Sequence, residues 1–130
     1  MDIGSNQLTT LPPGIFDALT NLQNLSAYTN QLTSLAPDVF NSLTNLTNLD
    51  LDNNQIASLV PGIFNSLTSL TNLDLDTNQI TSLSTGIFDT LSNLNRLYLN
   101  NNPITSFPAG IFDGLTSISS MTIYPACNTA

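Results

Sequence analysis

The sequence contains almost no basic residues and few groups that catalyse reactions. Lysine, histidine, glutamate and tryptophan are absent, and Arg96 is the single base against nine aspartates, which gives a formal net charge of -8. Clustered Lys and Arg are needed to bind nucleic acid or an anionic membrane surface, so the composition argues against both partners. No apolar run approaches the roughly 18 residues of a membrane span, and we expect no membrane insertion.

Cysteine is nearly absent as well. Cys127 is the only one, so an internal disulfide is excluded. Without histidine or glutamate there is no Cys–His nucleophile pair, and the usual zinc ligand sets are missing. We therefore predict that the protein is not an enzyme and needs no cofactor. The chain starts within a repeat, at Asp2, without a signal segment, and we interpret it as a fragment.

What the sequence does contain is a repeat of 24 residues. Both asparagine and phenylalanine recur at this spacing, and a Leu-rich period in this range predicts a solenoid. We divide the single domain 1–130 into a partial repeat 1–21, full repeats 22–45, 46–69, 70–93 and 94–117, and a terminal strand and tail 118–130. The two series are Asn6, Asn30, Asn54, Asn78 and Asn102, and Phe16, Phe40, Phe64, Phe88 and Phe112.

Each repeat predicts one short strand and one return segment. In Leu46-x-x-Leu49-x-Leu51, the residues around Leu49 alternate inward and outward as a strand requires. Equal spacing makes the strands parallel, and the remaining residues supply the crossover. Prolines and glycines there favour turns and short helical pieces over a long helix. The prediction is an α/β, β-rich solenoid in which the Asn series pairs buried backbone groups and the Phe series packs as a spine.

This pattern resembles the leucine-rich repeat family in its 24-residue extracellular form. The segment from Asn6 to Asp17, with Leu19 and Leu22, looks like repeats of variable lymphocyte receptors and Toll-like receptors. The resemblance covers residues 2–123. It implies a right-handed solenoid whose parallel sheet lies on a concave face and binds a protein or glycan, outside the cell or at its surface.

The repeat is interrupted at two places. Ala27 stands where other repeats carry Leu or Ile, which should leave a cavity or a local collapse. After Ile123, Ala126 replaces the expected Asn, so we expect the solenoid to end there, with Cys127 as the one candidate remnant of a cap.

Once the structural series are set aside, the outward positions of the strands provide the candidate site. Asp50, Asp52, Asp74 and Asp76 should form a rectangle with strands about 4.8 Å apart. Each nearest pair should repel by about 1 kcal/mol in water. Two interpretations stay open: a calcium site, or a solvated acidic patch with raised pKa values. The candidate ligand-binding residues are Tyr28, Asp50, Asp52, Asp74, Asp76, Arg96, Tyr98 and Asn100, with Arg96 either an anchor or a counter-charge for Asp74.

Three functions follow from these features. The first is a ligand-binding module that uses the concave face. The second is a structural or adhesive repeat that self-associates end to end, because uncapped sheets offer unpaired strand edges. The third is binding to ice or to a crystal surface through a charge-free row of Thr9-Thr10, Thr33-Ser34, Ala57-Ser58, Thr81-Ser82 and Thr105-Ser106.

Overall fold

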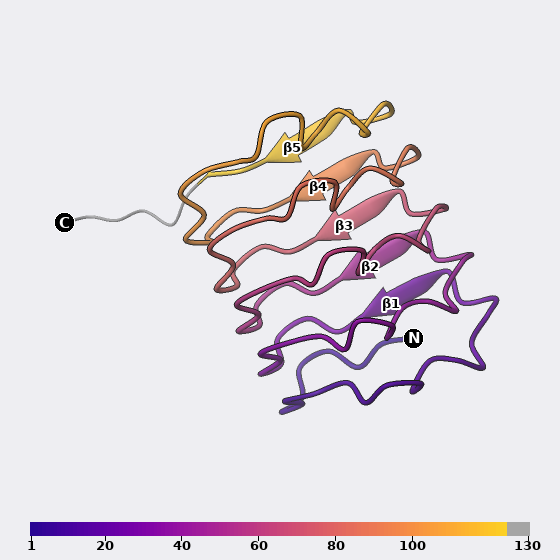
Figure 1. The fold of residues 1–130 in the computed structure, drawn as a ribbon. Coiled ribbons are helices and arrows are strands. Elements are labelled where there is room, and N and C mark those ends of the chain that lie inside the picture. The colour runs from indigo at the N-terminus through magenta and orange to yellow at the C-terminus, as the bar shows by residue number, and fades with distance from the viewer. Residues whose placement is uncertain (125–130) are drawn as a thin grey trace.

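The computed structural model describes residues 1–124 as successive coils, each with one strand and one return segment (Figure 1). Residues 125–130, which include Ala126 and Cys127, lie outside the described part. The strands form one parallel sheet in chain order and point the same way (Figure 1). They are β1 (Asn24–Ser26), β2 (Asn48–Asp50), β3 (Asn72–Asp74), β4 (Arg96–Tyr98) and β5 (Ser120–Thr122). The predicted β-rich solenoid with a parallel sheet is confirmed.

The sheet keeps the register that the period predicts. Leu25 pairs with Leu49, and the pairing continues in the same register to Met121 in β5. The first coil joins the sheet through an isolated parallel bridge between Asp2 and Ser26. Because the central residue of each strand points inward, the two residues beside it face outward in aligned rows.

The return segments are built from turns, and the short helical pieces expected there do not occur among residues 1–124. In the third coil the Ile63 N–H donates to the Val60 carbonyl at 3.2 Å, across Pro61 and Gly62. Gly62 has φ of +83°, the value at the third position of a type II turn, which favours glycine. The chain continues through further three-residue-spaced turns such as Asn65 N–H to Gly62 O at 3.0 Å. The second coil, with Asp38 in place of the glycine, forms the same series of turns.

The buried asparagines bridge neighbouring coils. The Asn54 Nδ2 group donates to the Ala27 carbonyl of the previous coil and to the Leu51 and Asp52 carbonyls of its own, each at 3.1 Å. Its Oδ1 accepts the Leu32 N–H at 3.1 Å. Buried backbone groups must be paired, and one amide side chain pairs four of them. The same set of bonds occurs at Asn30, Asn78 and Asn102, whereas Asn6 is exposed.

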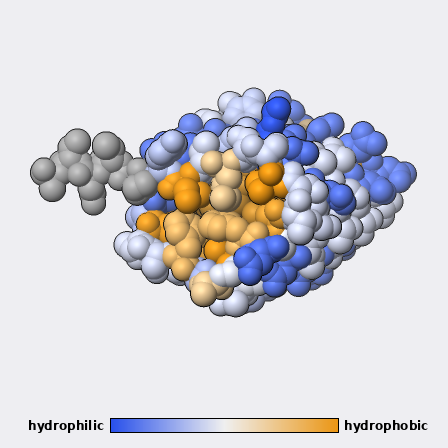
Figure 2. Space-filling view, turned by 90° about the horizontal axis from the view of Figure 1, so that it is seen from above, coloured by the Kyte–Doolittle hydropathy of each residue, from blue (hydrophilic) through white to orange (hydrophobic). Residues whose placement is uncertain are grey.

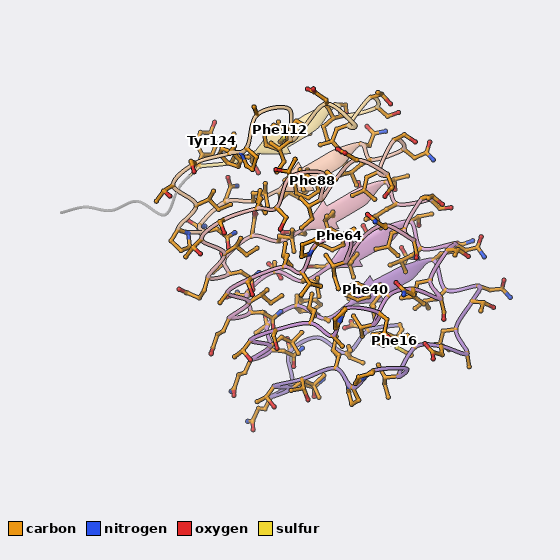
Figure 3. The ribbon with its side chains drawn as sticks, viewed as in Figure 1. Phe16, Phe40, Phe64, Phe88, Phe112 and Tyr124 are labelled. Carbon is orange, nitrogen blue, oxygen red and sulfur yellow. The ribbon has the colours of Figure 1, made fainter. Side chains whose placement is uncertain are left out.

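The phenylalanines stack along the solenoid in a column (Figure 3). Successive ring centroids from Phe40 to Phe64 and from Phe64 to Phe88 lie 6.5 and 6.4 Å apart, with interplanar angles of 13° and 10°. Phe88 and Phe112 continue the stack at 6.3 Å. Around this column the inward leucines and isoleucines of the inner coils are almost fully buried. Hydrophobic burial of this kind, repeated coil by coil, is what stabilises a solenoid.

The interruption at Ala27 does not disturb the backbone. Ala27 is fully buried, and its N–H donates to the Asp50 carbonyl at 2.8 Å, as the equivalent Leu51 does to Asp74 at 2.9 Å. The cavity expected beside Ala27 stays a prediction. A groove of about 550 Å³ lies elsewhere, between residues 10–13 of the first coil and residues 34–37 of the second.

Candidate ligand-binding face

The outward side chains of the strands form two rows across the coils, which together we call the sheet face. One row joins Ser26, Asp50, Asp74, Tyr98 and Thr122 through the strand register, with Asp2 at its start. The other row consists of Tyr28, Asp52, Asp76, Asn100 and Tyr124. Backbone hydrogen bonds between neighbouring coils, at a constant sequence spacing, align it; examples are Thr29 N–H to Asp52 O at 2.9 Å and Asn53 N–H to Asp76 O at 3.0 Å. The two rows bring the candidate acids side by side from β2 and β3.

Asp50, Asp52, Asp74 and Asp76, which we call the acidic patch, are all half-buried. One carboxylate oxygen from each of Asp50, Asp52 and Asp74 lies within 4.8 Å of the others. Asp76 turns to the next coil instead, where its Oδ1 accepts the Asn100 N–H at 2.6 Å. The carboxylates of three of the four predicted acids therefore lie together, and the fourth, Asp76, accepts a hydrogen bond from the backbone that follows β4.

Two of the carboxylates also accept a hydrogen bond from a backbone N–H two residues further along the chain. Asp50 Oδ1 accepts the Asp52 N–H at 3.1 Å, and Asp74 Oδ1 accepts the Asp76 N–H at 3.0 Å. This local bond, in which a short acidic side chain caps the residue two positions ahead, is a known preference of aspartate. It was not anticipated from the sequence, although Asp-x-Asp spacing in both coils is its visible signal. It orients Asp50 and Asp74 and leaves the Asp52 carboxylate as the freest member.

The electrostatics of the patch follow from burial and crowding. The pKa of Asp52 is raised to about 6, and burial is the largest cause. The charge of Asp50, a hydrogen bond with Asp50 and the charge of Asp76 contribute in the same direction. Burial also raises the pKa of Asp74 to about 6, with further contributions from the neighbouring carboxylates and an opposing one from the Asp76 N–H. Burial raises the pKa of Asp76 too, while its bonds to Asn100 oppose the shift. Asp52, Asp74 and Asp76 therefore take up protons more readily than ordinary aspartates.

The same oxygens define what the patch could hold. Hard cations such as calcium take oxygen ligands, and Asp50, Asp52 and Asp74 supply three that converge. Calcium sites use about six to eight oxygens, so water would have to complete the shell on this face. The donor chemistry fits a cation, and the raised pKa values fit a protonated patch, so both interpretations of the acids persist at this point.

The aromatic and basic candidates differ in their surroundings. Tyr28 lies over the first coil, since a Cβ at Gly4 would come within 2.5 Å of its Cε1 atom. Tyr98 lies half-buried in the same row as Asp74, and Arg96 is exposed between Asn72 and Ser120. The charges acting on the pKa of Asp74 come from other aspartates, and Arg96 is not among them. Whether Arg96 acts as an anchor for ligand or as a counter-charge stays a prediction.

The remaining candidates lie at the edges of the sheet face. Asn100 is half-buried, and its Oδ1 accepts the Tyr124 N–H at 2.9 Å, so its side chain is engaged in structure. The charge-free row from Thr9 to Ser106 is exposed in every coil, which fits either solvation or contact with a regular surface. Nowhere in residues 1–124 is there a helix with the length and apolar character needed to cross a bilayer.

Comparison with known proteins agrees with this geometry. The sequence profile described as "Leucine rich repeat" matches residues 28–80 and 68–123. Among solved structures, the chain is similar to the TLR13 chain of the TLR13–ssRNA13 complex, with a TM-score of 0.89 and 30% sequence identity over 95% of this chain. It spans 18% of the length of that longer chain. No curated protein matches it.

Proposed function

The chain belongs to the leucine-rich repeat family, and from this premise we propose that it is a non-catalytic module that binds a protein or glycan ligand through its sheet face. Solenoids with repeats like those of Toll-like receptors are generally binding rather than catalytic proteins. Similarity to such repeats also supports a location outside the cell or at its surface. The single observation that carries the proposal is the acidic patch, with Tyr98 and Arg96 beside it.

This surface is chemically different from the rest of the solenoid. The inward positions repeat one residue type from coil to coil, whereas the outward rows change from Ser26 to Asp50 to Tyr98. Partly buried carboxylates hold a strong field in their vicinity, and exposed Tyr and Arg are favoured anchors at interfaces. A ligand with basic groups, such as a Lys- or Arg-containing polypeptide segment or an amino sugar, has the complementary chemistry.

Nucleic acid is a poorer match to this face. The similar structure is a complex of TLR13 with single-stranded RNA, but in this chain the sheet face carries the four carboxylates of the acidic patch together with Asp2, and the whole chain has a single Arg. Phosphate binding gains its energy from Lys and Arg that displace counterions. We propose that RNA is not the ligand here and include it as a negative probe below.

The proposal is tested by selection of peptides from a random display library, together with a glycan array. We expect the wild-type chain to enrich ligands with Lys, Arg or amino-sugar groups and to ignore single-stranded RNA. The double variant Asp52→Asn/Asp76→Asn should lose this enrichment. The matched control Asp89→Asn/Asp113→Asn removes the same charge from exposed turns and should keep it. Equal loss in both variants, or enrichment of RNA, would refute the sheet face as the site.

A second candidate function is favoured by one observation. The ten residues of the row from Thr9-Thr10 to Thr105-Ser106 are exposed, uncharged and spaced by the regular coil repeat. A periodic row of exposed residues, all hydroxyl-bearing except Ala57, suits contact with ice or a crystal surface. Thermal hysteresis of the wild-type chain measures this directly, and its absence removes this candidate without affecting the first.

A further inference from the structure

The corner at which a return segment ends and the next strand begins carries polar side chains that bridge neighbouring coils. The Asn45 Nδ2 group donates to the Thr20 carbonyl of the previous coil at 2.8 Å, and the Asn93 Nδ2 group donates to the Thr68 carbonyl at 2.9 Å. Both asparagines are exposed, and both stand three residues before a strand. Described coils flank both residues, so this geometry belongs to the inner repeats.

Two residues further on, hydroxyl side chains bridge the coils in the same way. Thr47 Oγ1 donates to the Gln23 carbonyl at 3.0 Å, and Thr71 Oγ1 donates to the Thr47 carbonyl at 2.9 Å. At the equivalent corners the two positions hold Asn21 with Gln23, Ser69 with Thr71, Asn93 with Asn95, and Ser117 with Ser119. Only Asn45-Leu46-Thr47 therefore combines the asparagine with the hydroxyl. Asn-x-Thr, with x other than proline, is the acceptor sequence for N-linked glycans.

The hydrogen bonding of Asn45 is compatible with an attached sugar. A side-chain amide carries two N–H donors. Asn45 uses one of them for the Thr20 carbonyl, and its Nδ2 group has no second acceptor among residues 1–124. An N-linked sugar replaces a single N–H hydrogen, so the bond to Thr20 can persist beside it. The buried ladder asparagines differ, because the Asn54 Nδ2 group donates to three carbonyls and has no hydrogen to spare.

The position of Asn45 in the coil also suits a large hydrophilic group. Seen along the solenoid, hydrophobic residues gather towards the middle of the coil and hydrophilic residues lie around them (Figure 2). Asn45 is exposed whereas Leu46 beside it is fully buried, so only the asparagine of this pair reaches solvent. Asn45 is not a member of the two outward rows of the sheet face. A glycan on Asn45 is therefore attached away from the proposed ligand-binding surface.

A second acceptor sequence, Asn24-Leu25-Ser26, lies within β1. Ser26 belongs to the sheet face and pairs with Asp50, so a glycan on Asn24 stands beside the acidic patch. Asn48 and Asn72 continue the row of Asn24, but each is followed by an aspartate two positions on and is no acceptor. Of the two acceptor sequences, the one at Asn45 is therefore the one that leaves the sheet face open.

We propose that Asn45 is an acceptor for an N-linked glycan, with a lipid-linked oligosaccharide as the donor. The Asn45 Nδ2 atom forms a bond to the anomeric carbon of the sugar. The bond between that carbon and an oxygen of the lipid diphosphate breaks, and the diphosphate leaves and takes up the amide proton. The inference rests on the proposed location outside the cell or at its surface, because this modification belongs to secreted proteins. It does not depend on which ligand the sheet face binds.

The test is the mass of the full chain after secretion from a eukaryotic host, before and after treatment with peptide N-glycosidase. The enzyme should remove a glycan and convert Asn45 to aspartate, which peptide mapping locates. Asn45→Gln and Thr47→Ala should lack this glycan, and Thr47→Ser should keep it. Asn95→Thr, which completes the acceptor sequence at Asn93 in the same corner geometry, should gain a further glycan. An unmodified Asn45 in the secreted wild-type chain, or modification of Asn24 alone, overturns the proposal.

A binding measurement separates this inference from the proposed function. The glycosylated wild-type chain and the unglycosylated Thr47→Ala variant should bind a display-selected Lys- or Arg-containing peptide equally, because the glycan is attached away from the sheet face. Binding by Thr47→Ala alone would overturn that placement. A chain that carries the glycan on Asn45 but enriches no peptide or glycan ligand would contradict the proposed function and still support the acceptor site.

Discussion

Replacing Asp52 by asparagine should stabilise the protein at pH 7, which is the reverse of the usual effect of a mutation at a half-buried site. The Asp52 carboxylate crowds Asp50 and Asp74 and takes no backbone bond, whereas Asp50 and Asp74 each accept one. An asparagine removes the repelling charge and can donate to the Asp50 carboxylate. The packing of Leu51 beneath it is unchanged.

The magnitude follows from the pKa shift. A rise of the Asp52 pKa from 3.8 to about 6 corresponds at full value to about 3 kcal/mol between the two protonation states. Asp52 is in contact with solvent, so screening reduces this, and we expect about 1 kcal/mol. In a chain of this size that raises the melting temperature by about 3–5 °C.

The sign of the pH dependence can be worked out from the same shift. Between pH 3.8 and about 6 the folded state holds protons on Asp52 and Asp74 that the unfolded state has released. The stability is therefore greatest below the unfolded pKa and falls as the pH rises through about 6. Wild type should be more stable at pH 5 than at pH 7, and Asp52→Asn should reduce this difference.

Urea denaturation followed by circular dichroism, at pH 5 and pH 7 with chelator present, measures both effects. The control Asp89→Asn removes one charge from an exposed turn and should change neither the stability nor its pH dependence by much. If Asp52→Asn were less stable than wild type at pH 7, or wild type more stable at pH 7 than at pH 5, the reasoning about the acidic patch would be wrong.

Further predictions concern the ladder, the core and the cation. Asn78→Leu should lower the free energy of unfolding by at least about 3 kcal/mol because it leaves four backbone groups unpaired, while Asn6→Leu should cost little. Ala27→Leu should add about 1–2 kcal/mol if the expected cavity exists, and a loss of stability would show that the coils have closed around alanine. Calcium and magnesium at equal concentration should shift the melting temperature equally, since three carboxylates on this face supply few of the required ligands. A larger calcium shift that Asp52→Asn abolishes would establish a specific cation site.

The regular part of the fold could be predicted because every coil has to pair the buried backbone groups that follow its strand. Each buried Asn solves the pairing of the backbone groups that follow a strand, so its 24-residue spacing predicts both the strand position and the register. The rows of outward residues then follow from the alternation of a strand, and Asp50 is indeed paired with Asp74.

The return segments could not be predicted to the same detail. Short apolar runs around Phe64 and Leu67 are compatible with either a helical turn or successive turns, and their spacing alone does not decide between the two. The left-handed residues Thr29 and Thr77 were also missed, because β-branched residues rarely adopt positive φ. Coil stacking imposes that conformation after each of β1 to β4, and sequence propensity does not report it.

The site was predictable in position but not in its internal contacts. Sequence spacing places Asp52 and Asp76 in one row, yet it does not reveal that the Asp76 carboxylate accepts the Asn100 N–H while the Asp52 carboxylate interacts with Asp50. Nor does it show Tyr28 lying over Gly4, which depends on the absence of a side chain in the neighbouring coil. These differences arise from side-chain orientation, which a repeat pattern does not encode.

Binding of ligand to the sheet face can be mapped residue by residue through the backbone amide shifts in nuclear magnetic resonance spectra. The probe is a Lys- or Arg-containing peptide obtained from the display selection. We expect the shifted amides to lie in residues 48–52, 72–76 and 96–100. Shifts confined to the return segments would show that the sheet face does not bind the peptide.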